Sequence, residues 1–261
     1  MGEYKTLRCQ KQNFGKLRKV TQKTVEELWQ DVVNFKKPLT VGCEKCTNGT
    51  ILVPKESGFG FYFEACGCWV DYESLQFSRE LFKFSNLSKG VLMRYNAKNW
   101  KPLDNLSFDD LKNIVLSSEA GNNWLFLYGG PGSGKTFSAV LACQIALLQE
   151  RSVYFAPVAA LLDDLRPNPS DQRRSKFVSY AVKNVDVLVL DDIGHEKSSE
   201  WVREQLYIII NQRWNDGKCI IFTSNFKVDN LKTTVSEAVY SRVKGDAMPI
   251  HFKSIDQRLI T

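Results

Sequence analysis

The sequence predicts an α/β fold in which helices wrap a parallel sheet, preceded by a small N-terminal module. Short apolar runs typical of buried strands alternate with segments of helical periodicity in the second half of the chain. A glycine-rich segment, GGPGSGKT, stands between one such strand and the helix after it. With 261 residues, 43% of them hydrophobic, the chain suits one domain of about 160 residues plus a smaller module.

The expected elements alternate along the chain. We expect strands at residues 124–128, 152–156, 185–190, 219–223 and 248–252. The expected helices lie at residues 107–118, 136–149, 172–183, 199–216 and 235–243. Because parallel strands end along one edge of a sheet, a ligand is expected at their carboxyl ends.

The glycine-rich segment Gly129–Thr136 fits the pattern GxxxxGK[ST] in its strand–loop–helix context. Its glycines let successive backbone N–H groups point at phosphate oxygens, and the positive end of the following helix adds to that field. Lys135 would reach the β- and γ-phosphates, and Thr136 would ligate Mg²⁺. The predicted ATP-binding residues are Gly129, Gly130, Pro131, Gly132, Ser133, Gly134, Lys135, Thr136 and Asp191.

Two carboxylates end the apolar run Val187–Leu190. Asp191 would hold the Mg²⁺ shell with Thr136, and Asp192 would orient and deprotonate an attacking water. Asp is also common where a strand enters a turn, but the upstream Lys135 favours the nucleotide interpretation. Asn225, just after the expected strand 219–223, would position that water or sense the γ-phosphate.

Together these elements resemble the AAA+ ATPases, and one stretch gives a closer match. DDIGHEKSSEWVREQLYIIINQRWNDGKCIIFTSNF, from Asp191 to Phe226, resembles the DnaC/DnaI-type helicase loaders of bacteria and phages. In that family the carboxylates run into a Trp-Val-Arg-Glu-Gln-Leu-Tyr helix, an Arg-aromatic pair and a Thr-Ser-Asn strand end. The ending from Ser241 to Arg258 is also similar, so the resemblance covers residues 100–261.

The resemblance implies an AAA+ ATPase that acts on a DnaB-type hexameric helicase, binds single-stranded DNA and self-associates through its ATPase domain. Arg242 would then enter the nucleotide site of a neighbouring subunit as a catalytic residue, although an arginine near a helix end is often only solvated. Loaders contact DNA in the segment corresponding to Arg166–Arg174, which here has arginines but no aromatic at its tip for base stacking. Few residues follow Phe252, so we expect no C-terminal lid. Arg258 would either touch nucleotide or cap the sheet.

The N-terminal part carries a cysteine pattern. Cys43 and Cys46 form CxxC, and Cys66 and Cys68 form CxC after nineteen intervening residues. This is a plausible Cys₄ zinc spacing, and the loader resemblance includes the same shape. Disulfides are the alternative, but the chain starts without an apolar signal segment, which favours a reducing, cytoplasmic setting. Cys143 and Cys219 fall on an expected buried helix face and a core strand, which indicates packing.

Charge concentrates at the start of the chain. Residues 1–23 hold seven Lys and Arg against Glu3, a net of +6 that equals the net charge of the whole chain. Such an arm is either a solvated tail or a contact for phosphate backbones. The expected domains are a basic arm and helix at 1–40, a zinc module at 41–84, a linker at 85–105 and an AAA+ ATPase domain at 106–261. No apolar run is long enough to span a membrane.

Three functions remain open at this stage. The favoured hypothesis is an ATP-dependent loader of a DnaB-type helicase in replication initiation, with slow, partner- or DNA-stimulated hydrolysis. An IstB-like transposition helper would instead bind duplex DNA and a transposase, and such proteins generally lack the cysteine module. The third is a nucleotide-gated adaptor with negligible turnover, which Asp192 in place of the commoner Glu keeps open.

Overall fold

The structure is a computed structural model, and it contains two separate sheets. The residues that it describes are 50–54, 61–65, 81–95, 106–117, 124–167, 172–196, 199–233 and 235–253. The smaller sheet is an antiparallel pair, β1 (Thr50–Pro54) and β2 (Phe61–Ala65), in which Thr50 lies opposite Ala65. Cys43, Cys46, Cys66 and Cys68 lie outside the described residues.

The larger sheet has five parallel strands in the order β4-β5-β6-β3-β7. Their bounds are Trp124–Gly129 for β3, Val153–Pro157 for β4, Val187–Asp191 for β5, Cys219–Ser224 for β6 and Ala247–Phe252 for β7. The chain leaves β3 toward β4 at one edge of the sheet and later returns to β7 at the other. The ends of β5, β6 and β3 therefore lie side by side at the point where the strand order reverses, where α/β sheets bind ligands.

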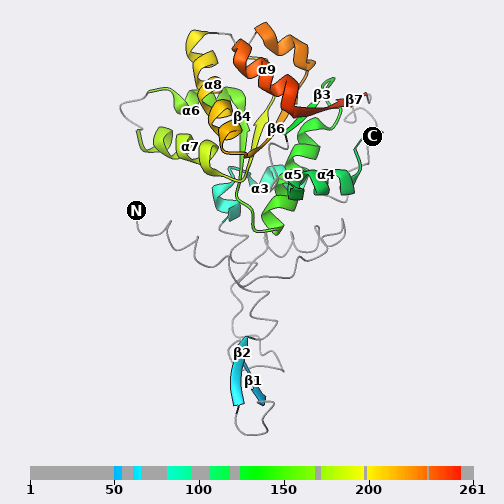
Figure 1. Cartoon of the computed structure of the whole chain (residues 1–261), viewed down its shortest axis with the longest axis vertical. Helices are drawn as coiled ribbons and strands as arrows, with labels where there is room; N and C mark the ends of the chain where they lie inside the picture. Colours follow the sequence, from blue (N-terminus) through cyan, green and yellow to red (C-terminus); the bar gives the residue numbers. More distant parts are fainter. Residues whose placement is uncertain are drawn as a thin grey trace.

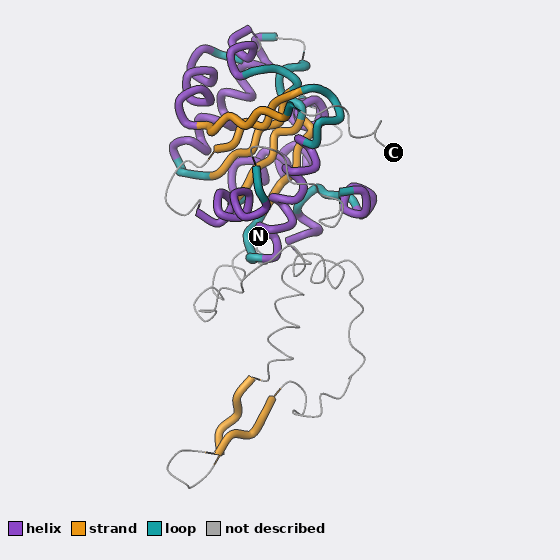
Figure 2. Tube along the Cα trace, turned by 90° about the vertical axis from the view of Figure 1, so that its right-hand side faces the viewer, coloured by secondary structure: helices purple, strands orange, loops and turns teal. Residues whose placement is uncertain are grey.

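Helices cover both faces of this sheet, which lies between them as a middle layer (Figures 1 and 2). One face packs α3 (Lys89–Arg94), α4 (Phe108–Ser117) and α5 (Lys135–Leu148) on strand residues such as Leu125 and Leu127. The other face packs α6 (Val158–Leu165), α7 (Gln172–Asn184), α8 (Glu200–Asn215) and α9 (Glu237–Asp246) on alternate residues such as Phe126 and Phe222. Because the side-chain period of a strand is two, strands apolar on both faces fit a sheet covered on both sides.

The expected strands and helices of the ATPase part are all present, with bounds shifted by a few residues. Two described elements of this region were not expected, α6 and the 3₁₀ helix η3 (Val228–Thr233). The last helix also continues through Gly245 to Asp246, instead of ending at Val243. Cys143 and Cys219 are buried, as predicted, and neither forms a disulfide.

The linker predicted at residues 85–105 is wrong for its first half. Leu87 and Leu92 are buried with the residues of α5, and the backbone N–H of Phe155 in β4 donates to the carbonyl of Ser85 over 2.9 Å. The run from Asn86 to Gly90 has the composition of a linker but contains the cap of a short helix, since Ser88 Oγ accepts from the N–H of Val91. Residues 85–95 therefore belong to the larger domain, and residues 96–105 lie outside the described ranges.

Arg213 in α8 is fully buried and joins three elements. Its guanidinium donates to the carbonyl of Val182 in α7 and to that of Cys219 at the start of β6. It also donates to the carbonyls of Val185 and Asp186, which lie between α7 and β5. Burial lowers the pKa of Arg213 to about 10. Within the described ranges, no helix is long and apolar enough to cross a membrane.

Candidate nucleotide site

The loop after β3 has the backbone shape that its sequence predicts. Gly129, Gly132 and Gly134 have φ angles of 153°, 71° and 100°, a range that residues with a side chain rarely adopt. At Gly129 an added Cβ would also lie 2.3 Å from the carbonyl oxygen of Phe252 in β7. Glycine is therefore required for the loop to turn and for β7 to pack beside it.

The loop opens onto the amino terminus of α5. The N-cap residue, Gly134, has no side chain that could bond the first N–H groups of the helix. N–H groups at the start of a helix point toward a bound anion, and the helix dipole favours negative charge at this end. In contrast, Ser199 and Ser236 cap α8 and α9 with their hydroxyl groups.

Lys135 lies under this loop with only 6% of its surface exposed. Its Nζ donates to the carbonyls of Gly129 and Gly130 at 2.9 and 2.7 Å. The ammonium group thus closes the turn and lies where phosphates would meet the helix end. A hollow of about 240 Å³ borders this region, lined by Tyr95 and by residues 132–137. Tyr95 also makes an edge contact with the ring of Phe137, at a centroid distance of 5.4 Å.

Asp191 lies at the end of β5, facing the start of α5. Its Oδ1 accepts from Thr136 Oγ1 at 3.0 Å and from Thr223 Oγ1, at the end of β6, at 2.6 Å. Burial raises the pKa of Asp191, and the two hydroxyl hydrogen bonds partly offset that rise. A hydroxyl and a carboxylate in contact are the hard oxygen donors that Mg²⁺ prefers, so Thr136 and Asp191 fit the predicted metal shell.

Asp192 begins the loop that follows β5. Its φ is 61°, and its N–H donates to Thr223 Oγ1 at 2.8 Å, which holds the residue against the end of β6. Its carboxylate accepts from the side-chain amide of Asn225 at 3.1 Å. The structure thus brings Asp191, Asp192 and Asn225 together with Lys135 and Thr136 at the carboxyl edge of the sheet, as predicted.

Arg242 lies elsewhere. It is in the last turns of α9, close to the start of β7, and Ala247 of β7 pairs with Trp124, the first residue of β3. The phosphate loop begins at the other end of β3, about 16 Å away along the strand. The guanidinium of Arg242 contacts the rings of Tyr207 and Trp214 in α8, at 5.9 and 5.0 Å from their centroids. It is therefore placed away from the nucleotide site of its own subunit.

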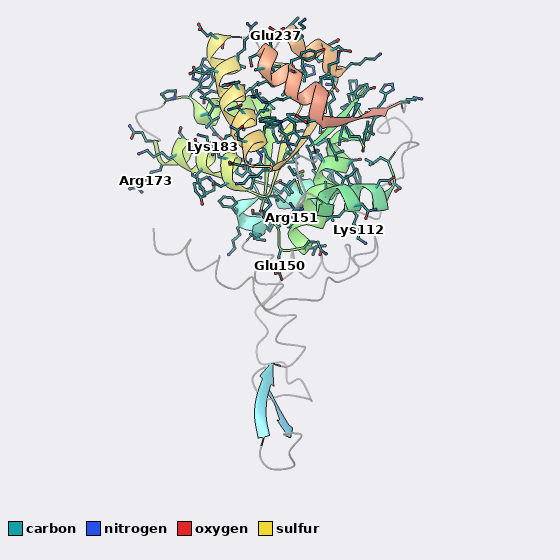
Figure 3. All side chains as sticks on the ribbon, viewed as in Figure 1. Lys112, Glu150, Arg151, Arg173, Lys183 and Glu237 are labelled. Atoms are coloured by element: carbon teal, nitrogen blue, oxygen red, sulfur yellow. The ribbon has the colours of Figure 1, made fainter. Side chains whose placement is uncertain are left out.

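The segment predicted to contact DNA is described only in part, since residues 168–171 lie outside the described ranges. Arg173 is exposed and points outward from the start of α7 (Figure 3). Arg174 instead pairs with Asp164 through two hydrogen bonds of 2.5 and 2.7 Å. Arg166 lies 5.5 Å from the ring centroid of Trp201, so an aromatic that the sequence places far from this segment lies beside it.

The sequence prediction missed two residues of the site, Thr223 and His195. Thr223 bridges Asp191 and Asp192, and a polar residue at the buried end of an apolar strand is a signal that could have found it. His195 contacts Asp192 and Asn225, and no local pattern marks it. Among the described residues no cluster of three or more His, Cys, Asp or Glu is arranged to hold a metal ion.

Residues 76–251 match the profile of the family described as IstB-like ATP binding protein. The chain belongs to this family. It is also 33% identical over 109 residues to the replicative helicase loader DnaI of Bacillus subtilis, and 26% identical over 126 residues to the loader DnaC of Escherichia coli K12. The chromosomal replication initiator DnaA of Latilactobacillus sakei is 32% identical over 135 residues.

The alignment with DnaI covers 41% of this chain and 35% of DnaI, that with DnaC covers 48% and 51%, and that with DnaA covers 50% and 30%. This chain therefore spans about half of each relative or less. A crystal structure of a DnaC helicase loader matches 62% of this chain and all of the solved chain, with a TM-score of 0.51 and 27% identity. A DnaA structure with AMPPCP and single-stranded DNA shares the fold, with a TM-score of 0.55 at 21% identity, over 62% of this chain and 50% of the solved one. The five-stranded parallel sheet is thus that of the AAA+ type.

Proposed function

We propose that this protein is an ATP-dependent loader that places a DnaB-type replicative helicase on DNA. The observation that carries the ATPase part is the contact of Thr136 Oγ1 with Asp191 Oδ1 at 3.0 Å, which joins the phosphate loop to the strand-end carboxylates. The helicase part rests on the similarity to DnaI and DnaC and on the match to a whole loader structure.

The described residues divide the work of hydrolysis. The N–H groups at the start of α5 and the ammonium of Lys135 bind the phosphates of ATP. Thr136 and Asp191 would hold Mg²⁺, which would supply positive charge beside the phosphates of ATP. Asp192 accepts the proton of the attacking water, and Asn225 orients the Asp192 carboxylate and the water. Tyr95, on the wall of the hollow beside the loop, packs against the adenine base.

Arg242 completes the site of a neighbouring subunit in this proposal. Its place in α9, near the start of β7, leaves it no use in its own site, and an arginine from a neighbour stabilises the charge that develops during phosphoryl transfer. Self-association through the ATPase domain is therefore part of the mechanism.

The N-terminal module is proposed to hold zinc and to contact the helicase. The hairpin of β1 and β2 supports the metal assignment, because Thr50 and Ala65 lie opposite each other at its open end. Cys66 follows Ala65 directly, and Cys46 precedes Thr50 by a short turn sequence. In the sequence the two cysteine pairs thus come just before β1 and just after β2, a spacing that suits a Cys₄ zinc site.

Single-stranded DNA is the proposed nucleic-acid partner. Arg173 is exposed on α7, and Arg166 lies over Trp201, which provides an aromatic ring beside basic groups. Stacking on an aromatic ring and contact with phosphates are the usual means of binding single strands.

The alternative function is that of an IstB-like transposition helper, and the family match favours it. The two functions differ in partner. A loader co-purifies with a DnaB-type helicase, whereas a transposition helper binds duplex DNA together with a transposase. Recovery of a transposase and no helicase would reverse the order of the two proposals.

The nucleotide assignment is tested by two variants. Lys135→Ala should abolish ATP binding in equilibrium titrations, whereas Asp192→Asn should bind ATP normally and lose hydrolysis by about 10²-fold or more. Lys232→Ala, which removes an exposed lysine of η3, is the control and should behave as wild type. Equal ATP affinity of wild type and Lys135→Ala would refute the site.

A further inference from the structure

His195 contacts two residues of the candidate hydrolytic centre, Asn225 and Asp192. Its Nε2 lies 2.8 Å from the amide nitrogen of Asn225 and 3.3 Å from Asp192 Oδ1. The same amide nitrogen donates to Asp192 Oδ1 at 3.1 Å. The imidazole, the carboxylate and the amide thus form a closed triangle, in which each side chain contacts the other two.

The triangle fixes the orientation of the Asn225 amide. An amide nitrogen carries two hydrogens, and here one is directed at Asp192 and the other at the ring nitrogen of His195. Nε2 is the acceptor of the second hydrogen in this arrangement. Exchanging the amide nitrogen and oxygen would set the amide oxygen against the Asp192 carboxylate and lose the hydrogen bond between them.

The backbone around His195 holds the ring in place. The N–H of Ile193 donates to the carbonyl of Thr223 at 2.9 Å, which ties the loop to β6. Glu196 Oε2 accepts from the N–H of Gly194 at 3.0 Å, where φ is 102°, and this closes the turn that carries His195. The imidazole also lies against the ring of Phe226, at a centroid distance of 4.9 Å.

Such a restraint matters because the groups that it restrains are not buried. The side chain of Asp192 is 56% exposed, and Asn225 is half-buried. A carboxylate and an amide in such places otherwise sample several rotamers, and few of them would aim at one water molecule. The ordered triangle limits both groups to one arrangement before a substrate arrives, and such positioning raises the rate of a chemical step.

We propose that His195 is a positioning residue for ATP hydrolysis, which acts through Nε2 on Asn225 and, through the Asn225 amide, on Asp192. This inference rests on the proposed ATPase function, and it adds to that function a residue that neither touches the phosphate loop nor holds the metal. The ring nitrogen supplies the effect, and the contact with Phe226 only supports the ring.

Two variants separate these contributions. His195→Phe keeps a ring against Phe226 and removes Nε2, whereas His195→Gln keeps a polar atom within reach of Asn225 and removes the ring. We expect His195→Phe to lower kcat for ATP by about 10- to 100-fold with KM unchanged, and His195→Gln to recover most of the rate. An active Phe variant beside a defective Gln variant would show that ring packing alone is required, and would overturn the proposal.

Binding measurements make the test independent of turnover. Asn225 is placed to meet the γ-phosphate, so loss of its restraint should reduce the preference for ATP over ADP in equilibrium titrations of His195→Phe. Lys135→Ala reports separately on the nucleotide site. Failure of Lys135→Ala to affect binding would sink the proposed function, whereas normal kcat and normal ATP preference in His195→Phe would sink only the role of His195.

Discussion

The guanidinium of Arg242 lies 5.0 Å from the centroid of the Trp214 indole ring, so α9 and α8 meet through a cation–π contact. The indole Nε1 in turn donates to Asp246 Oδ2 at 2.8 Å, which fixes the ring against the end of α9. Arg242 Nη1 also donates to the carbonyl of Ala238 at 3.4 Å. The arginine is therefore held on the outside of its own domain, in a defined direction.

Arg242→Ala should bind ATP like the wild-type protein and lose partner- or DNA-stimulated hydrolysis by about 10²-fold or more, because the neighbouring site lacks its cation. Mixing this variant with Lys135→Ala should restore part of the turnover, since each protein then supplies the half-site that the other lacks. Arg203→Ala, at an exposed arginine near the start of α8, is the control. Unchanged stimulated hydrolysis in Arg242→Ala would mean that Arg242 is only a helix-end charge.

The aromatic rings should have a smaller effect than the arginine that they hold. An exposed cation–π contact is worth about 0.5–1 kcal/mol, so Trp214→Leu should lower stimulated hydrolysis by about 2- to 5-fold. Trp214→Phe keeps an aromatic face and should lose less. The comparison is made at saturating ATP, in the same mixing assay, and a loss in Trp214→Leu as large as that in Arg242→Ala would indicate that Trp214 itself lies in the subunit contact.

The buried carboxylate of Asp191 should lower the stability of the protein without ligand. Because burial raises its pKa, the carboxyl group favours the folded state most when protonated, below its ordinary value of 3.8. That contribution is lost as the pH rises through the raised pKa of the folded state. At pH 7 Asp191→Asn should therefore raise Tm, by about 2–4 °C for each kcal/mol relieved, in metal-free protein.

With Mg²⁺ and ATP bound, the wild-type protein should instead have the higher Tm, because the carboxylate of Asp191 supports the metal shell and the amide of Asp191→Asn does not. Thermal unfolding with and without Mg·ATP measures both effects, and Asp163→Asn, at a carboxylate 78% exposed, is the control. A variant that is less stable than wild type without ligand would contradict the prediction.

Local sequence patterns were sufficient for most of the sheet and for the residues at its carboxyl edge. The strand ending in Asp191 is apolar on both faces, and the loop from Gly129 to Thr136 has a spacing that few other structures require. The short helix α3 was misread because its Ser88 cap and Gly90 resemble a linker in composition. The contact of Arg242 with Trp214, and that of His195 with Asn225, join residues distant in sequence, and no periodicity encodes such pairs.

Arg213 is a further contact of this kind, and its removal should be costly. The guanidinium satisfies carbonyls of Val182, Val185 and Cys219 that are otherwise buried between α7, β5 and β6. Arg213→Leu leaves these acceptors unpaired, so we expect a loss of about 3 kcal/mol or more in the free energy of unfolding. Arg213→Lys, which cannot reach all of them, should lose less. Denaturant titrations measure the change, and a loss near zero would show that the surrounding backbone rearranges.

The hairpin of β1 and β2 leads to the last prediction, which concerns the metal. The purified protein should contain about one zinc per chain, because four cysteines that precede and follow a hairpin in the sequence can complete a tetrahedral site. Cys66→Ser should release the zinc and weaken helicase binding, while Mg·ATP binding by the ATPase domain persists, since Asp191 ends a strand of the other sheet and Lys135 begins the helix packed on it. Cys9→Ser, outside the CxxC and CxC pairs, should retain the metal. Metal analysis that finds no zinc in protein prepared without chelator would refute the site, and zinc retained by Cys66→Ser would remove Cys66 from its ligands.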